Sequence, residues 1–281
     1  MEKIATYSRT SYLCNKYGLR AKKGYGQNFI IDYNIVDNIA FAACDSEDCV
    51  IEIGPGIGAL TQPLALRAKQ VYSFEIDPRC VEVLHESLED INNVEIIYRD
   101  FLEVDVQDFV DQLKKDFCSI KVASNLPYYI TTPLLFKLFA IKGIDAITVM
   151  MQKEVANRFI ARENTKDYNA LSVMAQYLFN VKLVMNVPNT IFDPKPKVDS
   201  AVIQFVPKDI VNKVEDEERF FAFVRDCFAQ RRKTLMNNIK AAHHDSAKVS
   251  AWLENRHLNG ALRSEQLSLD QFIDLYRWVN V

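Results

Sequence analysis

The feature that most constrains this chain is an alternation of short apolar runs with helical patterns between Val50 and Phe205. Such alternation is typical of βαβ units, which build a mainly parallel sheet covered by helices. The expected strands, each bounded by Gly, Pro, Asn or Asp, are Val50–Ile53, Gln70–Glu75, Val94–Tyr98, Lys121–Ser124, Ala146–Met151, Lys182–Val187 and Ala201–Val206. The pattern therefore predicts an α/β fold with a doubly wound, seven-stranded, mainly parallel sheet.

Helical periodicity divides the rest of the chain. Between the strands it predicts helices over Ile35–Ala43, Leu60–Ala68, Cys80–Leu88, Thr132–Phe139, Lys153–Ala161 and Leu171–Phe179. After a polar linker it predicts only helices, over Arg219–Ala229, Lys233–Ala242, Ala247–Asn255 and Leu269–Val279. Residues 1–26 lack core periodicity and include Lys22 and Lys23. We therefore expect a mobile basic arm at 1–26, an α/β domain at 27–207 and a small all-helical domain at 208–281.

Composition excludes several classes of protein. The net charge is −3, from 34 Lys and Arg against 37 Asp and Glu, so any nucleic-acid surface must be a local basic patch. Lys137, Lys142 and Asp145 interrupt the longest apolar stretch, and the N-terminus does not resemble a signal peptide, so we expect a cytoplasmic protein without a membrane partner. The six cysteines are scattered without C-x-x-C pairs, which predicts neither a disulfide framework nor a metal site.

A glycine-rich turn indicates a nucleotide-like ligand. Gly54 and Gly56 follow the first expected strand directly and precede the helix that starts near Leu60. Glycine permits a sharp turn and a close approach of the backbone to a ligand. Glu75 ends the next strand, about 20 residues on, where its carboxylate can accept hydrogen bonds from ribose hydroxyls. This combination is compatible with a nicotinamide dinucleotide as well as with S-adenosylmethionine.

The next two strand ends differ from those of a dehydrogenase. Asp100 follows the third expected strand, where it can accept from an adenine amino group, and Asn125 follows the fourth. Ligands of open α/β sheets collect at the carboxyl ends of the strands. Each of these residues alone can be an ordinary cap or turn residue. Four successive strands, however, each end in or just before a residue of a type that binds ligands, and all four ends are expected at one edge of the sheet. This pattern predicts a binding site there.

The tetrapeptide Asn125-Leu126-Pro127-Tyr128 suits the methylation of an adenine amine. That nitrogen is a poor nucleophile, and the Asn125 amide oxygen and the Leu126 carbonyl can accept its two N–H groups and stabilise the developing positive charge. Pro127 stiffens the loop and offers no N–H. Tyr128 supplies an aromatic face on which an unstacked base can rest. We expect positioning and electrostatics, with no strong base, to carry the reaction.

The chain resembles the rRNA adenine N6-methyltransferase family, whose fold is a Rossmann-like methyltransferase sheet and whose cofactor is S-adenosyl-L-methionine. The resemblance covers nearly the whole chain and begins at Lys23-Gly24-Tyr25-Gly26-Gln27-Asn28-Phe29-Ile30. It implies that Asn28 and Ile30 contact the methionine end of the cofactor, that Gly54 and Gly56 lie against it, and that Glu75 and Asp100 bind its ribose and adenine. It also implies that Asn125 lies between cofactor and target amine, and that Phe192, in Phe192-Asp193-Pro194-Lys195-Pro196, stacks on the target base.

The C-terminal half resembles the small-subunit dimethyltransferases of that family. Phe228-Ala229-Gln230-Arg231-Arg232-Lys233-Thr234-Leu235 carries this resemblance, and Tyr168-Asn169-Ala170-Leu171-Ser172 supports it. The family usually has Pro-Gly before that tyrosine, where this chain has Arg162–Thr165. The cations Arg231, Arg232 and Lys233, like Lys22 and Lys23 of the arm, are suited to RNA phosphates, although a solvated helix face would look the same.

The resemblance implies a monomeric enzyme that dimethylates two adjacent adenines of small-subunit (16S) rRNA within an assembling subunit. One alternative is a large-subunit (23S) rRNA adenine methyltransferase of the macrolide-resistance type. A second is a ribosome-assembly factor that binds RNA without turnover, and a third is a nicotinamide-dependent oxidoreductase. The intact Asn125 motif disfavours the last two.

Overall fold

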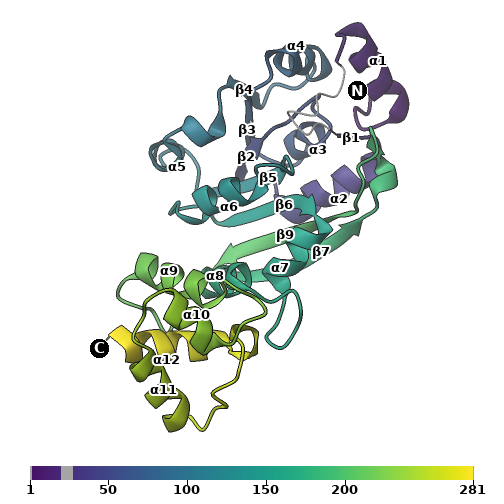
Figure 1. Cartoon of the computed structure of the whole chain (residues 1–281). Coiled ribbons are helices and arrows are strands. Elements are labelled where there is room, and N and C mark those ends of the chain that lie inside the picture. The colour runs from purple at the N-terminus through teal and green to yellow at the C-terminus, as the bar shows by residue number, and fades with distance from the viewer. Residues whose placement is uncertain (1, 20–27, 281) are drawn as a thin grey trace. The chain divides into compact units, whose positions relative to one another are not determined.

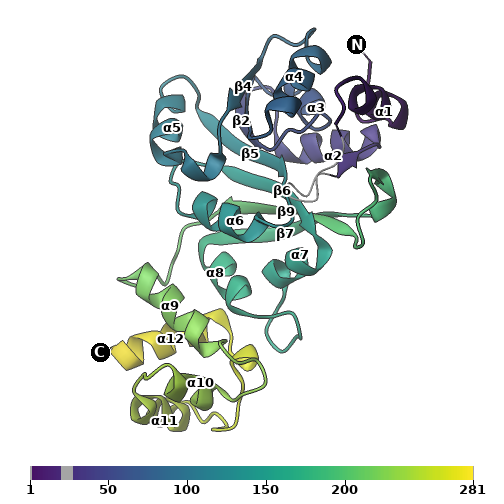
Figure 2. The same cartoon turned by 45° about the horizontal axis from the view of Figure 1, so that its top comes forward.

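Figures 1 and 2 show the computed structural model of the chain, which describes residues 2–19 and 28–280. Within this range the chain divides into two compact units. The first contains the residues up to Ala156 together with Lys182–Pro207, and the second contains Asn157–Val181 together with the residues from Lys208 onward. Each unit has its own buried apolar core.

The sheet has seven strands in the order β4-β3-β2-β5-β6-β9-β7 (Figure 1). These strands are β2 (Asp48–Ile53), β3 (Gln70–Glu75), β4 (Val94–Tyr98), β5 (Ser119–Asn125), β6 (Ala146–Gln152), β7 (Phe179–Val187) and β9 (Ser200–Pro207). Neighbours from β4 to β6 pair in parallel, and β9 pairs antiparallel to β6. The predicted α/β class with a mainly parallel, seven-stranded sheet is confirmed.

The helices that connect these strands largely follow the predicted periodicity. They are α2 (Tyr33–Ala43), α3 (Thr61–Ala65), α4 (Pro78–Ser87), α5 (Val106–Leu113), α6 (Thr131–Phe139) and α7 (Lys153–Ile160), with a short 3-10 helix η2 at Phe101–Glu103. Helix α5 is absent from the predicted set. It buries Val106, Val110 and Leu113 along one face, and the Asp105 side chain caps it. Val106, Phe109, Val110 and Leu113 lie at i, i+3, i+4 and i+7, so the sequence carries a clear helical signal here that the sequence analysis overlooked.

The N-terminal residues belong to the first unit. Residues 2–19 contain helix α1 (Tyr7–Lys16), and Ile4 is buried. The Gln62 side chain in α3 accepts a hydrogen bond from the Ile4 N–H at 2.9 Å and donates one to the Glu2 carbonyl at 2.8 Å. The prediction of a mobile arm is therefore wrong for residues 2–19. The contacts that hold this segment come from residues about 60 positions later, so local periodicity could not reveal them.

The second unit is helical. It contains α8 (Ala170–Leu178), α9 (Glu217–Cys227), α10 (Leu235–Ala241), α11 (Ser246–Asn255) and α12 (Leu269–Asn280). The Tyr177 hydroxyl accepts a hydrogen bond from the Val214 N–H at 3.0 Å, and its ring centroid lies 5.2 Å from that of Phe220. Residues 157–181 thus pack with the C-terminal helices, whereas the sequence analysis placed them in the 27–207 domain. In the part of the chain that the structure describes, no helix is long and apolar enough to cross a membrane.

The loop at 162–165 lacks the glycine that is usual in the family, but it reaches a conformation typical of glycine. Asn164 has a φ of 64°, in the left-handed region that Asn tolerates better than most residues. Its N–H donates to the Glu265 carbonyl at 2.8 Å, and the Thr165 hydroxyl donates to the Arg162 carbonyl at 2.6 Å. Asn164 therefore provides the turn at the place where the resemblance led us to expect Pro-Gly.

A buried carboxyl group links three elements beneath the glycine-rich turn. Glu52 in β2 is 1% exposed, and its Oε2 accepts hydrogen bonds from the Thr61 hydroxyl at 2.7 Å and the Ser73 hydroxyl at 2.8 Å. Burial raises the pKa of Glu52 to about 7, although both hydroxyls oppose the rise and the nearby Glu75 adds to it. Glu52 therefore joins β2, α3 and β3 through a group that titrates near neutrality.

Close packing also explains the third glycine of the turn. Gly58 has a φ of 91°, which side chains rarely adopt. A Cβ atom here would lie 3.2 Å from the Ser87 hydroxyl, 3.3 Å from a Leu88 methyl and 3.4 Å from an Ile4 methyl. Gly58 therefore allows the N-terminal segment and α4 to approach the turn closely.

We predict that Gly58→Ala destabilises the protein more than Gly18→Ala. Both positions have positive φ, but no heavy atom lies within 4 Å of a Cβ at Gly18. In urea unfolding followed by circular dichroism, the free energy of unfolding of Gly58→Ala should be lower than that of Gly18→Ala by about 1–3 kcal/mol, the usual range for overpacking. Equal losses would show that only the backbone conformation matters at Gly58.

We predict that Glu52→Gln changes how stability depends on pH. The unfolded carboxyl ionises near its ordinary pKa of 4.5, whereas the folded one stays protonated until about 7. Wild-type stability should therefore fall relative to Glu52→Gln as pH rises from about 4.5 to 7, by ~3 kcal/mol, and level off above that. Denaturant unfolding at half-unit pH steps measures the difference, and parallel curves for the two proteins would contradict the prediction.

Candidate functional site

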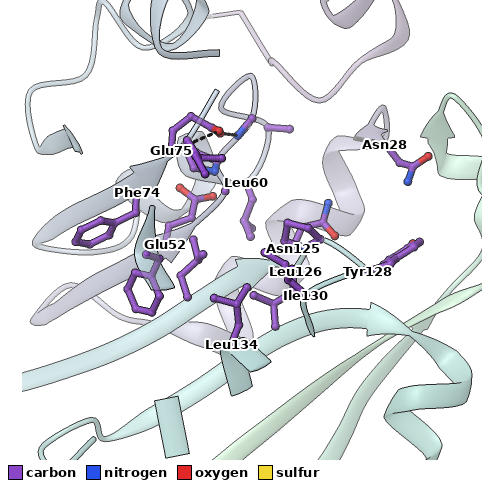
Figure 3. Close-up of a pocket in the computed structure, with 18 of the residues that line it drawn as sticks. Asn28, Glu52, Leu60, Phe74, Glu75, Asn125, Leu126, Tyr128, Ile130 and Leu134 are labelled. Atoms are coloured by element: carbon purple, nitrogen blue, oxygen red, sulfur yellow. Dashed lines mark hydrogen bonds between the residues drawn. The ribbon is translucent and has the colours of Figure 1, made fainter. Parts of the chain in front are cut away.

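Parallel pairing brings four strand ends to one edge of the sheet. Gly54 follows β2, Glu75 ends β3, Asp100 follows β4 and Asn125 ends β5. All four line one pocket, and the close-up in Figure 3 shows Glu75 and Asn125 in its wall. The structure therefore brings together the residues that the strand pattern singled out.

The glycine-rich turn places backbone directly against this pocket. Gly54 and Gly56 have φ values of 69° and 61°, and the Gly54 N–H donates to the Phe74 carbonyl at 2.9 Å. A Cβ at Gly54 would lie 3.8 Å from the Pro127 ring. Glycine at this position keeps the space between the turn and the Asn125–Tyr128 loop open.

Glu75 is held in place by backbone amides. Its Oε2 accepts from the Gly56 N–H at 3.0 Å, and its Oε1 accepts from the Ile76 and Asp77 N–H groups, each at 2.8 Å. Burial raises the pKa of Glu75, and these three hydrogen bonds oppose the rise. A carboxylate has about four acceptor positions, so about one stays open for a ligand. Acceptance from both ribose hydroxyls therefore requires one of the backbone bonds to give way.

Asp100 combines the role of a cap with a place in the pocket wall. Its Oδ1 accepts from the Leu102 N–H at 2.8 Å and so caps η2. The Phe101 ring is buried, with its centroid 5.2 Å from that of Phe74. Asp100, Phe101 and Leu102 all line the pocket. The capping role that the sequence analysis left open is thus present alongside the position expected for an adenine-binding residue.

The Asn125–Tyr128 loop connects β5 to α6. The Leu126 N–H donates to the Met150 carbonyl at 3.1 Å, and the Thr131 hydroxyl donates to the Pro127 carbonyl at 2.9 Å. The Tyr128 and Ser200 hydroxyls lie 2.6 Å apart, which fixes the tyrosine ring. Burial raises the pKa of Tyr128, so its hydroxyl stays protonated near neutral pH. The loop is therefore braced at each end.

A two-stranded sheet joins the two segments whose roles came only from the family resemblance. Strand β1 (Phe29–Ile30) pairs antiparallel with β8 (Phe192–Asp193). Asn28, Ile30 and Phe192 all line the pocket, and Asn28 is among the lining residues labelled in Figure 3. Phe192 is only 3% exposed. Stacking of a base on this ring therefore requires its neighbours to move.

Several pocket residues were missed by sequence reasoning. Glu52 lies in its floor, hidden in the sequence within a strand of apolar neighbours. Ile76 and Leu102 also line it and are 42% and 37% exposed. Tyr129 is 53% exposed in the same wall, next to Tyr128. The signal available for Ile76 and Tyr129 was adjacency to Glu75 and Tyr128. Across the described residues, no group of three or more His, Cys, Asp or Glu residues is arranged to hold a metal ion.

The basic triplet of the second unit lies in a turn between α9 and α10. Arg231 and Arg232 were expected between two helices, whereas Lys233 was expected to begin the second, which instead begins at Leu235. Arg231, Arg232 and Lys233 are all exposed. The buried Asn238 side chain braces the turn, because it donates to the Cys227 carbonyl at 2.7 Å and accepts from the Gln230 N–H at 3.1 Å.

Arg231 also has partners within the second unit. Its guanidinium donates to the Lys166 carbonyl and lies 4.0 Å from a Glu265 carboxylate oxygen. Of the three predicted RNA contacts in this turn, Arg231 is thus engaged within its own unit. Lys22 and Lys23, the other proposed RNA contacts, lie outside the described residues.

Sequence comparison identifies relatives over almost the entire chain. Residues 18–281 match the family described as ribosomal RNA adenine dimethylase. The ribosomal RNA small subunit methyltransferase A of Bacillus licheniformis is 45% identical over 276 residues, which cover 96% of this chain and 94% of that protein. The protein of the same name from Leuconostoc mesenteroides is 43% identical over 279 residues, covering 97% and 95%.

Solved structures agree with this match. A dimethyladenosine transferase from Plasmodium falciparum has a TM-score of 0.71 at 27% identity, covering 89% of this chain and 97% of that one. The 23S rRNA methyltransferase ErmE has a TM-score of 0.68 at 28% identity, covering 90% and 100%. The architecture and the strand-edge pocket of this chain, together with these similarities, lead to one conclusion: the chain belongs to the ribosomal RNA adenine dimethylase family.

Proposed function

We propose that this protein uses S-adenosyl-L-methionine to methylate the N6 amines of two adjacent adenines in small-subunit (16S) rRNA. The observation that carries the proposal is the position of Asn125–Tyr128 in the same pocket as Gly54, Glu75 and Asp100. One pocket therefore offers a nucleoside-binding edge and a pair of amine acceptors. Membership of the ribosomal RNA adenine dimethylase family supports both the cofactor-binding edge and the site for the target amine.

The residues at the strand edge suit an adenosine-bearing cofactor. Gly54 and Gly56 leave room beside the backbone, Glu75 has an open acceptor position for a ribose hydroxyl, and Asp100 can accept from an adenine amine. Asn28 and Ile30 would contact the methionine end. When bound, S-adenosylmethionine supplies an electrophilic methyl group on a positively charged sulfur.

The chain's own contribution to the reaction is orientation and electrostatics. The Asn125 amide oxygen and the Leu126 carbonyl would accept the two N–H groups of the target amine, which directs its lone pair and stabilises the positive charge as it develops. These acceptors are firmly placed, because Asn125 ends a central strand and Leu126 is bonded to β6. Pro127 adds no competing donor. The protonated Tyr128 is suited to hold the base by its ring rather than to act as a base catalyst.

Sequence similarity favours the small-subunit substrate. The relatives at 43–45% identity are named for the small subunit, whereas the large-subunit enzyme ErmE is 28% identical. The strand-edge geometry suits either RNA, so the choice of substrate depends on surfaces outside the pocket. We assign that role to the second unit, through Arg232, Lys233 and Arg231, together with Lys22 and Lys23 near the N-terminus. We further propose that the protein acts as a monomer in the cytoplasm on an assembling small subunit.

We predict that Asn125→Ala abolishes methylation without abolishing cofactor binding. Loss of one preorganised acceptor should lower kcat by about 100-fold or more. Mass spectrometry of small-subunit rRNA fragments, after incubation of unmethylated subunits with labelled cofactor, would measure transfer, and calorimetry with S-adenosylhomocysteine would measure binding. Tyr128→Phe is the matched control, because it keeps the ring and loses only the contact with Ser200. Wild-type transfer by Asn125→Ala would refute the role of Asn125. Label confined to large-subunit rRNA, when both subunits are supplied and both rRNAs are analysed, would refute the small-subunit assignment.

We predict that the double variant Arg232→Ala/Lys233→Ala binds small-subunit rRNA more weakly and with less dependence on salt. Each lost phosphate contact should reduce the slope of log K against log salt by about 1, so the double variant should lose about 2. Arg231 is left intact because it is bonded within the second unit. Arg219→Ala, which removes a cation paired with Asp216 in the same unit, serves as the control. An unchanged slope would exclude these residues from the RNA interface.

A further inference from the structure

A lysine on α6 joins two walls of the pocket. The Lys137 Nζ donates hydrogen bonds to the carbonyl oxygens of Leu102 at 2.5 Å and Val104 at 2.7 Å. It also lies 6.0 Å from the centroid of the Phe101 ring. These contacts connect helix α6 to the η2 segment, and Lys137 itself does not line the pocket.

The η2 segment is held at both ends by charged side chains. Asp100 accepts from the Leu102 N–H and so caps its N-terminal end. Carbonyl groups at the C-terminal end of a helical turn lack partners within the turn, and a cation stabilises them. Lys137 provides that cation. The position of the Asp100 carboxylate in the pocket wall therefore depends on a side chain from a different element.

The other end of this connection is the Asn125–Tyr128 loop. Helix α6 begins just after that loop, and the Thr131 hydroxyl in its first turn donates to the Pro127 carbonyl at 2.9 Å. Ile130 and Leu134 line the pocket just before Lys137. Helix α6 thus links the Asn125–Tyr128 loop, which we propose holds the target amine, to Lys137, which holds η2.

We propose that Lys137 is a positioning residue that fixes the Asp100–Leu102 wall relative to the Asn125–Tyr128 loop and thereby sets the affinity for the cofactor. The inference rests on the proposed function, because it takes Asp100 as the acceptor for the cofactor's adenine. Lys137 acts through η2, because it bonds that segment and is not among the residues that line the pocket. The role requires the ammonium group, because that group donates hydrogen bonds to two carbonyls at once.

Titration calorimetry with S-adenosylhomocysteine tests this role on the full-length protein. Lys137→Met, which keeps a long unbranched side chain but removes the donors, should weaken binding about tenfold, equivalent to about 1.4 kcal/mol. Lys137→Arg, which keeps a cationic donor, should bind within about threefold of wild type. Lys114→Met is the matched control, because Lys114 also bonds a carbonyl and a carboxylate, those of Cys118 and Asp145, but does not contact η2. It should leave the affinity unchanged.

A double-mutant cycle with Asp100→Asn separates positioning from general loss of stability. If Lys137 acts through the Asp100 wall, the two losses of affinity should be clearly less than additive. In steady-state assays Lys137→Met should raise KM for the cofactor about tenfold while kcat changes less than about threefold. Tight binding by Lys137→Met, or fully additive losses, would overturn the Lys137 proposal alone. An Asp100→Asn variant that binds like wild type would overturn the adenine assignment and the route through Lys137 with it.

Discussion

Parallel pairing of β4, β3, β2 and β5 is the constraint on which the rest of the site depends. Because these neighbours all run in one direction, their carboxyl ends meet at one edge, and the residues that follow them face a common space. Residues separated by up to 71 positions in the sequence, from Gly54 to Asn125, come together for this reason. The local sequence at each strand end then decides what the edge can bind.

Buried and partly buried polar groups convert this edge into a defined pocket. Glu52 joins three elements below it, and the amides of Gly56, Ile76 and Asp77 hold Glu75. Lys137 connects η2 to the helix after the Asn125–Tyr128 loop. Most of these bonds link elements that are distant in the sequence. A preorganised site of this kind suits a reaction in which the cofactor is already activated and the protein contributes mainly placement. The same bonds limit the freedom of the ligand-binding groups, as the three amides on Glu75 illustrate.

Much of the fold and part of the site could be predicted from the sequence. The strand pattern predicted all seven strands of the sheet, and the strand-end residues Gly54, Glu75, Asp100 and Asn125 share one pocket as expected. Two of the errors have a common cause. The packing of residues 2–19 and the membership of residues 157–181 in the second unit depend on partners such as Gln62 and Val214, which periodicity cannot locate. Helix α5, by contrast, was overlooked although its apolar residues have helical spacing.

The sequence by itself determined the fold class, the family and the chemical character of the strand edge, because hydrophobic periodicity and short motifs are local properties of the chain. Only the tertiary structure decided which groups at the strand edge are free to bind a ligand. It placed Phe192 in the core, used most acceptor positions of Glu75 for backbone amides, and tied the Asp100 wall to Lys137. Two of the amides on Glu75 belong to Ile76 and Asp77, which follow it directly. The burial of Phe192, the Gly56 amide on Glu75 and the bonds from Lys137 are contacts between distant segments, and such contacts exist only once the sheet has brought those segments together.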